Sequence, residues 1–449
     1  MIKKLILIFA LLPSLALSQH TIQGTFSPAD NYSWIILYKI TPTATEYVKN
    51  VEVKDTGNIS IELGHTDSKG IYKLVYALPQ QDYNFDVIYD GEEDIVFTFS
   101  EDKGIEFTKS AENKLLASYT KSMVLINQTL NSFYSKGSHD ETAYMKIVET
   151  LKDAQNSFEN ASKGKMVAHF IKANAPYIPS SFEDSATYFN HVKAAYLEHV
   201  DFNDPVLQSS DFLIQRILSY VFDLNKDHST ATYKTNVDTV AEAIKTTQLQ
   251  YQSVLLEVLW NQFVETQNGV MANYVADTHL IPIAKALENQ KLVNKLMVYK
   301  NTAIGNVAPD FSFKIQGTDG EKETTTMHQL KGHQQYLILF WSSTCGHCLA
   351  ELPILKKYLD SNPENDIQVV AIGLEEAHSP WDKESLKYPE FIHIFGEGKW
   401  DNPISDAYGV TGTPSFFLLD AEKHILAKPD DVEALKTFLE NHPITSEKQ

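Results

Sequence analysis

The chain has 449 residues, about the length of three domains, with 43% hydrophobic and 21% charged residues. This composition is typical of a globular protein and excludes both a single small scaffold and a wholly disordered chain. Its 38 basic and 58 acidic residues give a net charge of −20, and Arg216 is its only arginine. Nucleic acid is therefore a poor expectation as a partner, and anionic lipid surfaces would repel the chain.

Residues 1–18 have the three-part layout of a secretory signal peptide. Lys3 and Lys4 precede an apolar run, and the segment ends on small residues. The run is short for the ~20 residues that span a bilayer, and Pro13 interrupts it, so cleavage is favoured over an uncleaved membrane anchor. We therefore expect a periplasmic product without membrane insertion after cleavage, though association with the envelope stays open.

Residues 19–108 form short runs rich in Val, Ile, Tyr, Phe and Thr, separated by turn signals such as Asp90-Gly91. This pattern predicts an antiparallel β-sandwich-like accessory domain. The expected strands include residues 34–38, 59–63, 71–76 and 95–99.

Residues 109–302 change to a helical period, which predicts an all-α domain. The histidines of this region show no paired spacing typical of metal ligands, so we interpret them as surface or core residues. The expected helices include residues 112–133, 143–162, 211–224 and 237–265.

Residues 303–449 alternate strand and helix patterns, which predicts an α/β domain of the βαβ type. The fold class expected for the whole chain is thus multidomain α+β, with an N-terminal antiparallel β domain, a central all-α region and this C-terminal α/β domain. The expected strands of the last domain are residues 336–341, 367–373 and 415–420, and its expected helices are residues 349–359 and 431–441.

The two cysteines of the chain, Cys345 and Cys348, lie in one Cys-X-X-Cys motif. A scaffold with several disulfides and a four-cysteine zinc site are both excluded, because each needs more cysteines. Cys345 follows a buried strand and should begin a helix, where backbone N–H groups and the helix dipole favour the thiolate. We expect Cys345 to be the nucleophile and Cys348, one helical turn further, to be the resolving thiol.

His347 between the two cysteines can stabilise the thiolate as a cation or as a hydrogen-bond donor. Such stabilisation favours the reduced form and makes the disulfide more oxidising. The direction of electron transfer, as a reductant or as an isomerase, stays open.

These residues resemble the thioredoxin superfamily, and more narrowly the redoxins of bacterial envelopes of the TlpA/ResA and alkyl-hydroperoxide-reductase type. The resemblance covers about the last third of the chain, and a weaker one, of layout alone, extends to the accessory regions of Bacteroidetes-type envelope redoxins. The motifs that carry it are Val307-Ala308-Pro309-Asp310-Phe311, Phe340-Trp341-Ser342-Ser343-Thr344-Cys345-Gly346-His347-Cys348 with Glu351 and Pro353, and Val410-Thr411-Gly412-Thr413-Pro414-Ser415-Phe416-Phe417.

The resemblance implies a thioredoxin fold for residues 303–449 and roles for several residues. Pro414 would be cis, and with Thr413 it would shape the groove for an extended substrate. Glu351 would exchange protons near Cys348, although a solvated helix carboxylate is an equal alternative. The substrate-binding set that it implies around the redox disulfide is Trp341, Gly346, His347, Thr413 and Pro414.

The sequence also departs from the family. Leu339 stands where cytoplasmic thioredoxins carry a buried Asp, which gives Glu351 more weight as the proton acceptor. Thr344 replaces the Trp that commonly precedes the nucleophile. The Gly346-His347 pair is that of protein disulfide isomerases, so a purely reducing role is in doubt.

The resulting hypothesis is a periplasmic thiol–disulfide oxidoreductase that acts on client proteins and needs no cofactor or metal. An upstream membrane or periplasmic dithiol donor would supply its electrons, and the two accessory domains could select clients, form a homodimer or tether the protein. Two alternatives stay open: a thiol peroxidase with antioxidant activity, and a non-enzymatic copper chaperone using the two thiolates and a histidine.

Overall fold

The structure, a computed structural model, describes most of the chain beyond its first residues. The predicted signal peptide, residues 1–18, lies outside the described part. The described residues are 20–64, 67–80, 82–316 and 322–442.

The chain divides into two compact units, Met1–Met271 and Ala272–Gln449. The first unit holds the N-terminal β-sheets and most of the helical region. The second unit holds the last helices of that region and the C-terminal α/β fold. The predicted fold class is therefore confirmed. The domain boundaries after residues 108 and 302 stay predictions.

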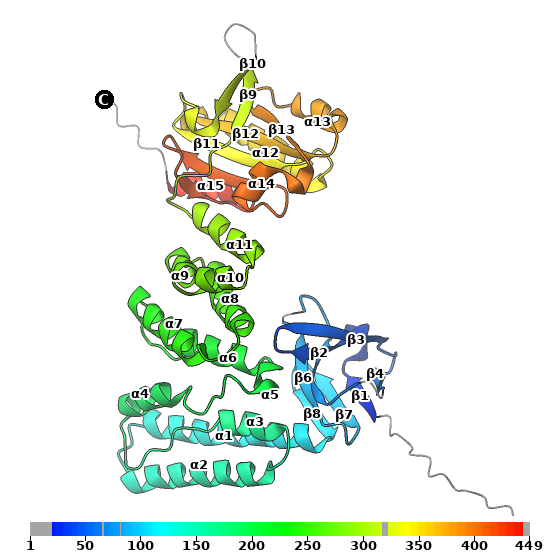
Figure 1. The fold of residues 1–449 in the computed structure, drawn as a ribbon, viewed down its shortest axis with the longest axis vertical. Helices are drawn as coiled ribbons and strands as arrows, with labels where there is room; N and C mark the ends of the chain where they lie inside the picture. The colour runs from blue at the N-terminus through cyan, green and yellow to red at the C-terminus, as the bar shows by residue number, and fades with distance from the viewer. Residues whose placement is uncertain (1–19, 65–66, 81, 317–321, 443–449) are drawn as a thin grey trace, which may run out of the picture. The chain divides into compact units, whose positions relative to one another are not determined.

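The first unit begins with two four-stranded sheets, in the orders β4-β1-β7-β8 and β3-β2-β5-β6 (blue in Figure 1). Apolar side chains from both sheets, such as Ile22, Leu37, Leu74 and Phe97, share one core. This shared core is the arrangement of a β-sandwich. The strands are β1 (His20–Phe26), β2 (Trp34–Thr41), β3 (Ala44–Glu52), β4 (Asn58–Leu63), β5 (Gly70–Val75), β6 (Asn84–Tyr89), β7 (Ile95–Ser100) and β8 (Gly104–Lys109).

One strand pair departs from the antiparallel prediction. β1 pairs with β7 in parallel, whereas its pairing with β4 and the pairings of the other strands here are antiparallel. A long stretch of chain separates β1 from β7, so the chain can return to the same end of the sheet before β7 begins. Alternation of residues within a strand carries no information about this direction.

The helical region follows, as predicted, and α1 and α2 form its first pair (cyan in Figure 1). None of the helices in the described part is both long and apolar enough to cross a membrane. The helices are α1 (Ala111–Ser135), α2 (Glu141–Ala161), α3 (Val167–Ala173), α4 (Ser185–Ala195), α5 (Pro205–Gln208), α6 (Phe212–Leu218), α7 (Thr230–Ile244), α8 (Leu249–Glu265), α9 (Gly269–Val275), α10 (Ile281–Ala286) and α11 (Gln290–Asn301).

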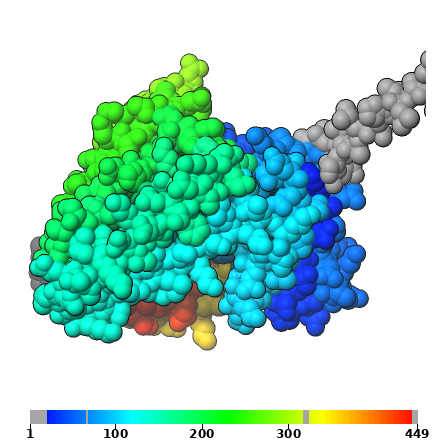
Figure 2. Space-filling view, turned by 90° about the horizontal axis from the view of Figure 1, so that it is seen from below, coloured from blue at the N-terminus to red at the C-terminus, as the bar shows by residue number. Residues whose placement is uncertain are grey.

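Buried polar side chains join the sheets to the first helices. The amide of Asn113, in the first turn of α1, accepts a hydrogen bond from the N–H of Ile88 at 2.8 Å and donates one to its carbonyl at 2.7 Å. Lys73 of β5 forms ion pairs with Asp86 of β6 and with Asp211, the residue before α6. These contacts hold the β part of the first unit against its helical part. The two parts form one continuous surface in the space-filling view (Figure 2).

The second unit contains a five-stranded sheet in the order β13-β12-β11-β14-β15. β11 lies in its centre, parallel to β12 and antiparallel to β14, and each of its residues is buried. A two-stranded hairpin of β9 and β10 accompanies the sheet. The strands are β9 (Ser312–Gln316), β10 (Lys322–Thr326), β11 (Gln335–Trp341), β12 (Ile367–Glu375), β13 (Ile392–Glu397), β14 (Ser415–Asp420) and β15 (Ile425–Ala427).

Helices cover both faces of this sheet. Alternate residues of β11 point to opposite faces and pack against different helices. Leu339 and Trp341 pack with α12 and α15, whereas Ile338 and Phe340 pack with α14. This burial on both faces explains the continuous apolar run of β11 in the sequence. The helices are α12 (Gly346–Ser361), α13 (His378–Ser385), α14 (Pro403–Tyr408) and α15 (Val432–Asn441).

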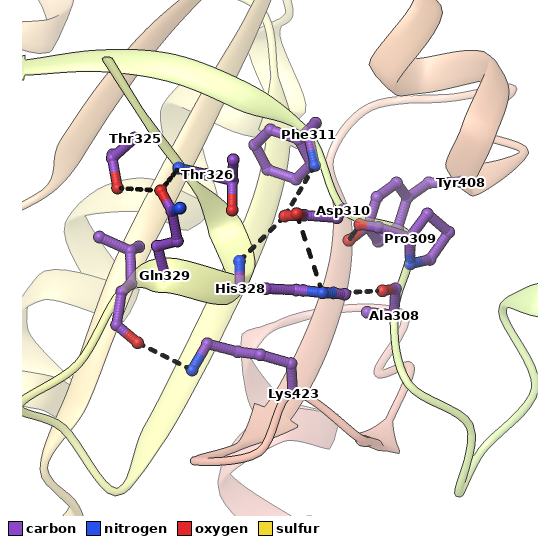
Figure 3. Close-up of polar contacts among 11 residues, drawn as sticks. Ala308, Pro309, Asp310, Phe311, Thr325, Thr326, His328, Gln329, Tyr408 and Lys423 are labelled. Atoms are coloured by element: carbon purple, nitrogen blue, oxygen red, sulfur yellow. Dashed lines mark hydrogen bonds and ion pairs between the residues drawn. The ribbon is translucent and has the colours of Figure 1, made fainter. Parts of the chain in front are cut away.

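Polar contacts fix the segment that leads into this fold (Figure 3). The Nε2 atom of His328 lies 2.7 Å from the carbonyl oxygen of Ala308, and the carboxylate of Asp310 accepts a hydrogen bond from the N–H of His328 at 2.9 Å. The hydroxyl of Tyr408 donates to the carbonyl of Pro309 at 2.6 Å. The Ala-Pro-Asp motif thus anchors the start of the fold.

Candidate active site at the start of helix α12

Cys345 lies where the central strand of the second unit passes into a helix. It is the N-cap of α12, and its Sγ accepts a hydrogen bond from the N–H of Cys348 at 3.2 Å. Its own N–H donates to the carbonyl of Ser342 at 3.1 Å, which closes the turn after β11. The thiol is partly exposed, whereas Cys348 is fully buried.

The two thiols differ in acidity. Burial raises the pKa of Cys345, but hydrogen bonds from Cys348, from the side chain of Thr413 and from the backbone of His347 outweigh it and hold this pKa below its ordinary value. Burial, together with the hydrogen bond to Cys345, raises the pKa of Cys348 to about 12. Near neutral pH Cys345 is thus the more nucleophilic sulfur and Cys348 stays a thiol.

The loop before β14 lies directly against Cys345. The Thr413–Pro414 peptide bond is cis, as the resemblance to redoxins implies. The Sγ atom of Cys345 lies 3.3 Å from the carbonyl oxygen of Thr413. The structure thus brings together Cys345, Cys348 and this loop, which are far apart in the sequence. Their roles in binding a substrate stay predictions.

Glu351 makes a contact that the sequence did not indicate. Its Oε2 accepts a hydrogen bond from the N–H of Val432 at 2.8 Å, at the start of α15. Its Oε1 lies 3.8 Å from Nε2 of the exposed His347, one helical turn earlier. The carboxylate therefore supports the start of α15 in the described structure, and proton exchange with Cys348 stays a prediction.

Glu375 is a residue of this site that the sequence reasoning missed. It ends β12, it is buried, and its carboxylate accepts a hydrogen bond from the N–H of Ser343, two residues before the nucleophile. A signal was present, because Glu375 lies just after the predicted strand at residues 367–373, and the carboxyl ends of parallel strands lie at one edge of a sheet.

The remaining predicted residues differ in exposure. Trp341 is fully buried and packs in the same core cluster as Cys348. Gly346 is exposed, and nothing lies within 4 Å of the position of an added Cβ. Elsewhere in the redoxin domain, Trp381 of α13 packs edge-on against Phe395, whereas Trp400 is 44% exposed. Contact of any of these residues with a substrate stays a prediction.

The described part of the chain contains no group of three or more His, Cys, Asp or Glu side chains that could hold a metal ion. What the arrangement can do chemically is exchange a disulfide. A partly exposed, acidified sulfur lies beside a buried thiol that can attack the mixed disulfide it forms.

Comparison with known proteins agrees with this geometry. Residues 303–436 match the Redoxin family. A curated relative, the thiol-disulfide oxidoreductase ResA of Oceanobacillus iheyensis, is 28% identical over 89 residues, which are 20% of this chain and 43% of that protein. The chain thus aligns with less than half the length of this relative.

Solved structures show similarity as well. A thioredoxin-like protein from Bacteroides caccae is 18% identical with a TM-score of 0.40, over 60% of this chain and 97% of that one. A thiol-disulfide oxidoreductase from Bacteroides fragilis is 22% identical with a TM-score of 0.26, over 30% of this chain and 98% of that one. By the family match and the geometry of its dithiol, the C-terminal part of the chain, residues 303–436, is a redoxin domain of the thioredoxin-like type.

Proposed function

We propose that the protein is an exported thiol–disulfide oxidoreductase that exchanges disulfides with client proteins through Cys345 and Cys348. The observation that carries this proposal is the asymmetry of the two sulfurs at the start of α12. The pKa of the partly exposed Cys345 is held below its ordinary value by hydrogen bonds, and that of the buried Cys348 is raised by burial. This asymmetry assigns attack to one sulfur and resolution to the other.

The reaction needs no cofactor. The Cys345 thiolate attacks a client disulfide, forms a mixed disulfide and releases one client thiolate, which takes up a proton. Cys348 loses its proton and attacks the sulfur of Cys345, which releases the second client thiolate and leaves the Cys345–Cys348 disulfide. Two electrons pass from the enzyme to the client, and the reverse sequence oxidises a client dithiol.

Export and partners belong to the proposal. The predicted signal peptide supports a periplasmic location, where a membrane or periplasmic dithiol donor would reduce the enzyme again. Arg216, the only arginine, lies in the first unit and the dithiol in the second. The redoxin unit thus lacks an arginine of its own to activate a peroxide, which favours exchange with proteins over peroxide reduction.

The test is the reduction potential of the Cys345/Cys348 pair in the mature chain, measured in glutathione buffers with trapping of free thiols. A value near about −270 mV would indicate a thioredoxin-like reductant, and one near about −120 to −180 mV an oxidant or isomerase. The Cys345→Ser variant is the control, because it cannot form the disulfide. A pair that never cycles between thiol and disulfide would contradict the proposal.

A further inference from the structure

A cavity of about 320 Å³ is lined by helical residues of the first unit. Its wall comes from α1, from the segment that follows α3, from α4 and from α6. Val124 of α1, Tyr188 and Val192 of α4, and Tyr196 supply apolar and aromatic surface. Apolar and polar side chains thus share the wall, and pockets that hold small organic molecules combine an apolar surface with a few polar contacts in the same way.

Arg216 lines this cavity and is 9% exposed. The centre of its guanidinium lies 4.3 Å from the ring centre of Tyr196 and 4.9 Å from that of Phe212. Its described hydrogen bonds go to neutral acceptors, the side-chain oxygen of Asn174 and, at 3.4 Å, the carbonyl of Tyr196. Because a guanidinium carries five N–H donors, some of its donors are free to bind a ligand.

No carboxylate of the described residues forms an ion pair with Arg216. The acidic side chains near the cavity are engaged elsewhere. Glu159 accepts a hydrogen bond from Gln155 at 2.8 Å. Glu183 accepts one from the hydroxyl of Tyr177 at 2.7 Å. No carboxylate of the described residues is thus paired directly with the guanidinium.

An unbalanced buried charge is costly, because the group loses water without gaining a counter-ion. Burial lowers the pKa of Arg216, yet a guanidinium stays protonated in proteins. Elsewhere in the same unit, a largely buried cation has acidic partners, because Lys73 forms ion pairs with both Asp86 and Asp211. A ligand with one negative charge would supply what Arg216 lacks.

We propose that this cavity binds a small organic monocarboxylate with an apolar body, whose carboxylate pairs with Arg216 and whose body lies against Tyr188, Val192 and Val124. The planar guanidinium matches a carboxylate with two parallel hydrogen bonds. One positive charge neutralises one negative charge, which favours a monocarboxylate over a phosphate carrying nearly two. The volume is near the lower end of ligand pockets, so the ligand is small.

The test uses the full mature chain and titration calorimetry with 3-phenylpropionate, with its uncharged amide, 3-phenylpropionamide, and with inorganic phosphate. We expect saturable binding of the carboxylate, binding of the amide that is weaker by about tenfold or more, and no competition by phosphate. Arg216→Gln should weaken binding of the carboxylate to the level of the amide.

A second variant guards against a folding defect of Arg216→Gln. Val124 is 47% exposed at the cavity, so Val124→Trp should fill the space and abolish binding without disturbing the core. Ala117→Trp, at an exposed position of α1 that does not line the cavity, is the matched control and should bind like the native chain. Each of four results would overturn the proposal: no saturation up to about 10 mM carboxylate, equal binding of acid and amide, unchanged binding by Val124→Trp, or displacement by phosphate.

Discussion

The backbone N–H of Ser343 donates a hydrogen bond to the buried carboxylate of Glu375. This bond ties the turn that precedes Cys345 to the end of the neighbouring strand β12. Hydrogen bonds to a charged acceptor are stronger than neutral ones, and a buried N–H without an acceptor is costly. Glu375 therefore holds the turn from which the nucleophile projects.

Glu375→Ala should destabilise the redoxin domain by about 1–3 kcal/mol, because it leaves the N–H of Ser343 without its acceptor. Glu375→Gln keeps an acceptor oxygen and should cost less. Urea unfolding followed by tryptophan fluorescence measures both. Equal stability of the Ala variant and the native chain would show that water replaces the carboxylate.

Cys345→Ser should abolish reduction of insulin, because the remaining sulfur is buried and its pKa is raised to about 12. Cys348→Ser should instead accumulate a mixed disulfide with the client, since nothing resolves it. Non-reducing gels of the two variants with the same oxidised client provide the comparison. Accumulation by Cys345→Ser and not by Cys348→Ser would reverse the assignment of the two sulfurs.

The rate of alkylation should report the lowered pKa of Cys345. Iodoacetamide reacts with thiolates, so the midpoint of the rate against pH should lie below the ~8.5 of a free cysteine. At a pH between the pKa of Cys345 and that of a free cysteine, Cys345 is more ionised than a free thiol. As the pH falls below the pKa of Cys345, its reactivity is lost. Mass spectrometry locates the label. Labelling of Cys348 first, or a midpoint above ~8.5, would contradict the described electrostatics.

Glu351→Ala should destabilise α15 by about 0.5–2 kcal/mol, because it removes the acceptor of the Val432 N–H. Glu351→Gln keeps an acceptor there and removes the proton-accepting group. If Glu351 only supports α15, the Gln variant should retain both its stability and its rate of exchange. Loss of the rate with native stability would instead establish proton transfer, and comparison of the two variants over a range of pH separates these roles.

Lys73→Met should destabilise the first unit by about 1–3 kcal/mol, because it leaves Asp86 and Asp211 as like charges without their cation. Adding Asp86→Asn to this variant should recover part of the loss. Chemical unfolding of both variants measures the effect. No loss in the single variant would show that the two carboxylates are adequately solvated without Lys73.

Much of the fold could be predicted because apolar periodicity records burial. β11 is an unbroken apolar run and α1 shows helical spacing, and both are found close to their expected bounds. The parallel pairing of β1 with β7 could not be predicted, because pairing direction depends on distant chain segments. The partition into two units is also a property of contacts between elements that no local pattern encodes.

The dithiol could be predicted because Cys-X-X-Cys is a local motif with a local mechanism. The contacts around the dithiol could not be predicted in this way, because they join distant parts of the sequence. The hydrogen bond from Val432 to Glu351 joins residues 81 positions apart, and that from Ser343 to Glu375 joins residues 32 apart. The sequence likewise could not show that Arg216 is hydrogen-bonded to neutral groups and paired with no acid of the described residues.

Cys345 is at once the reactive sulfur and the capping group of α12. Each exchange with a client turns its anionic sulfur into a neutral disulfide sulfur, which is a weaker acceptor for the N–H of Cys348. We therefore expect the cap of α12 to be weaker while Cys345 is in a mixed disulfide or in the Cys345–Cys348 disulfide, and to regain its strength when the pair is reduced. The same hydrogen bond that raises the thiolate fraction of Cys345 also makes Cys345 a better leaving group, so a mixed disulfide that Cys348 does not resolve is readily reversed by a client thiolate.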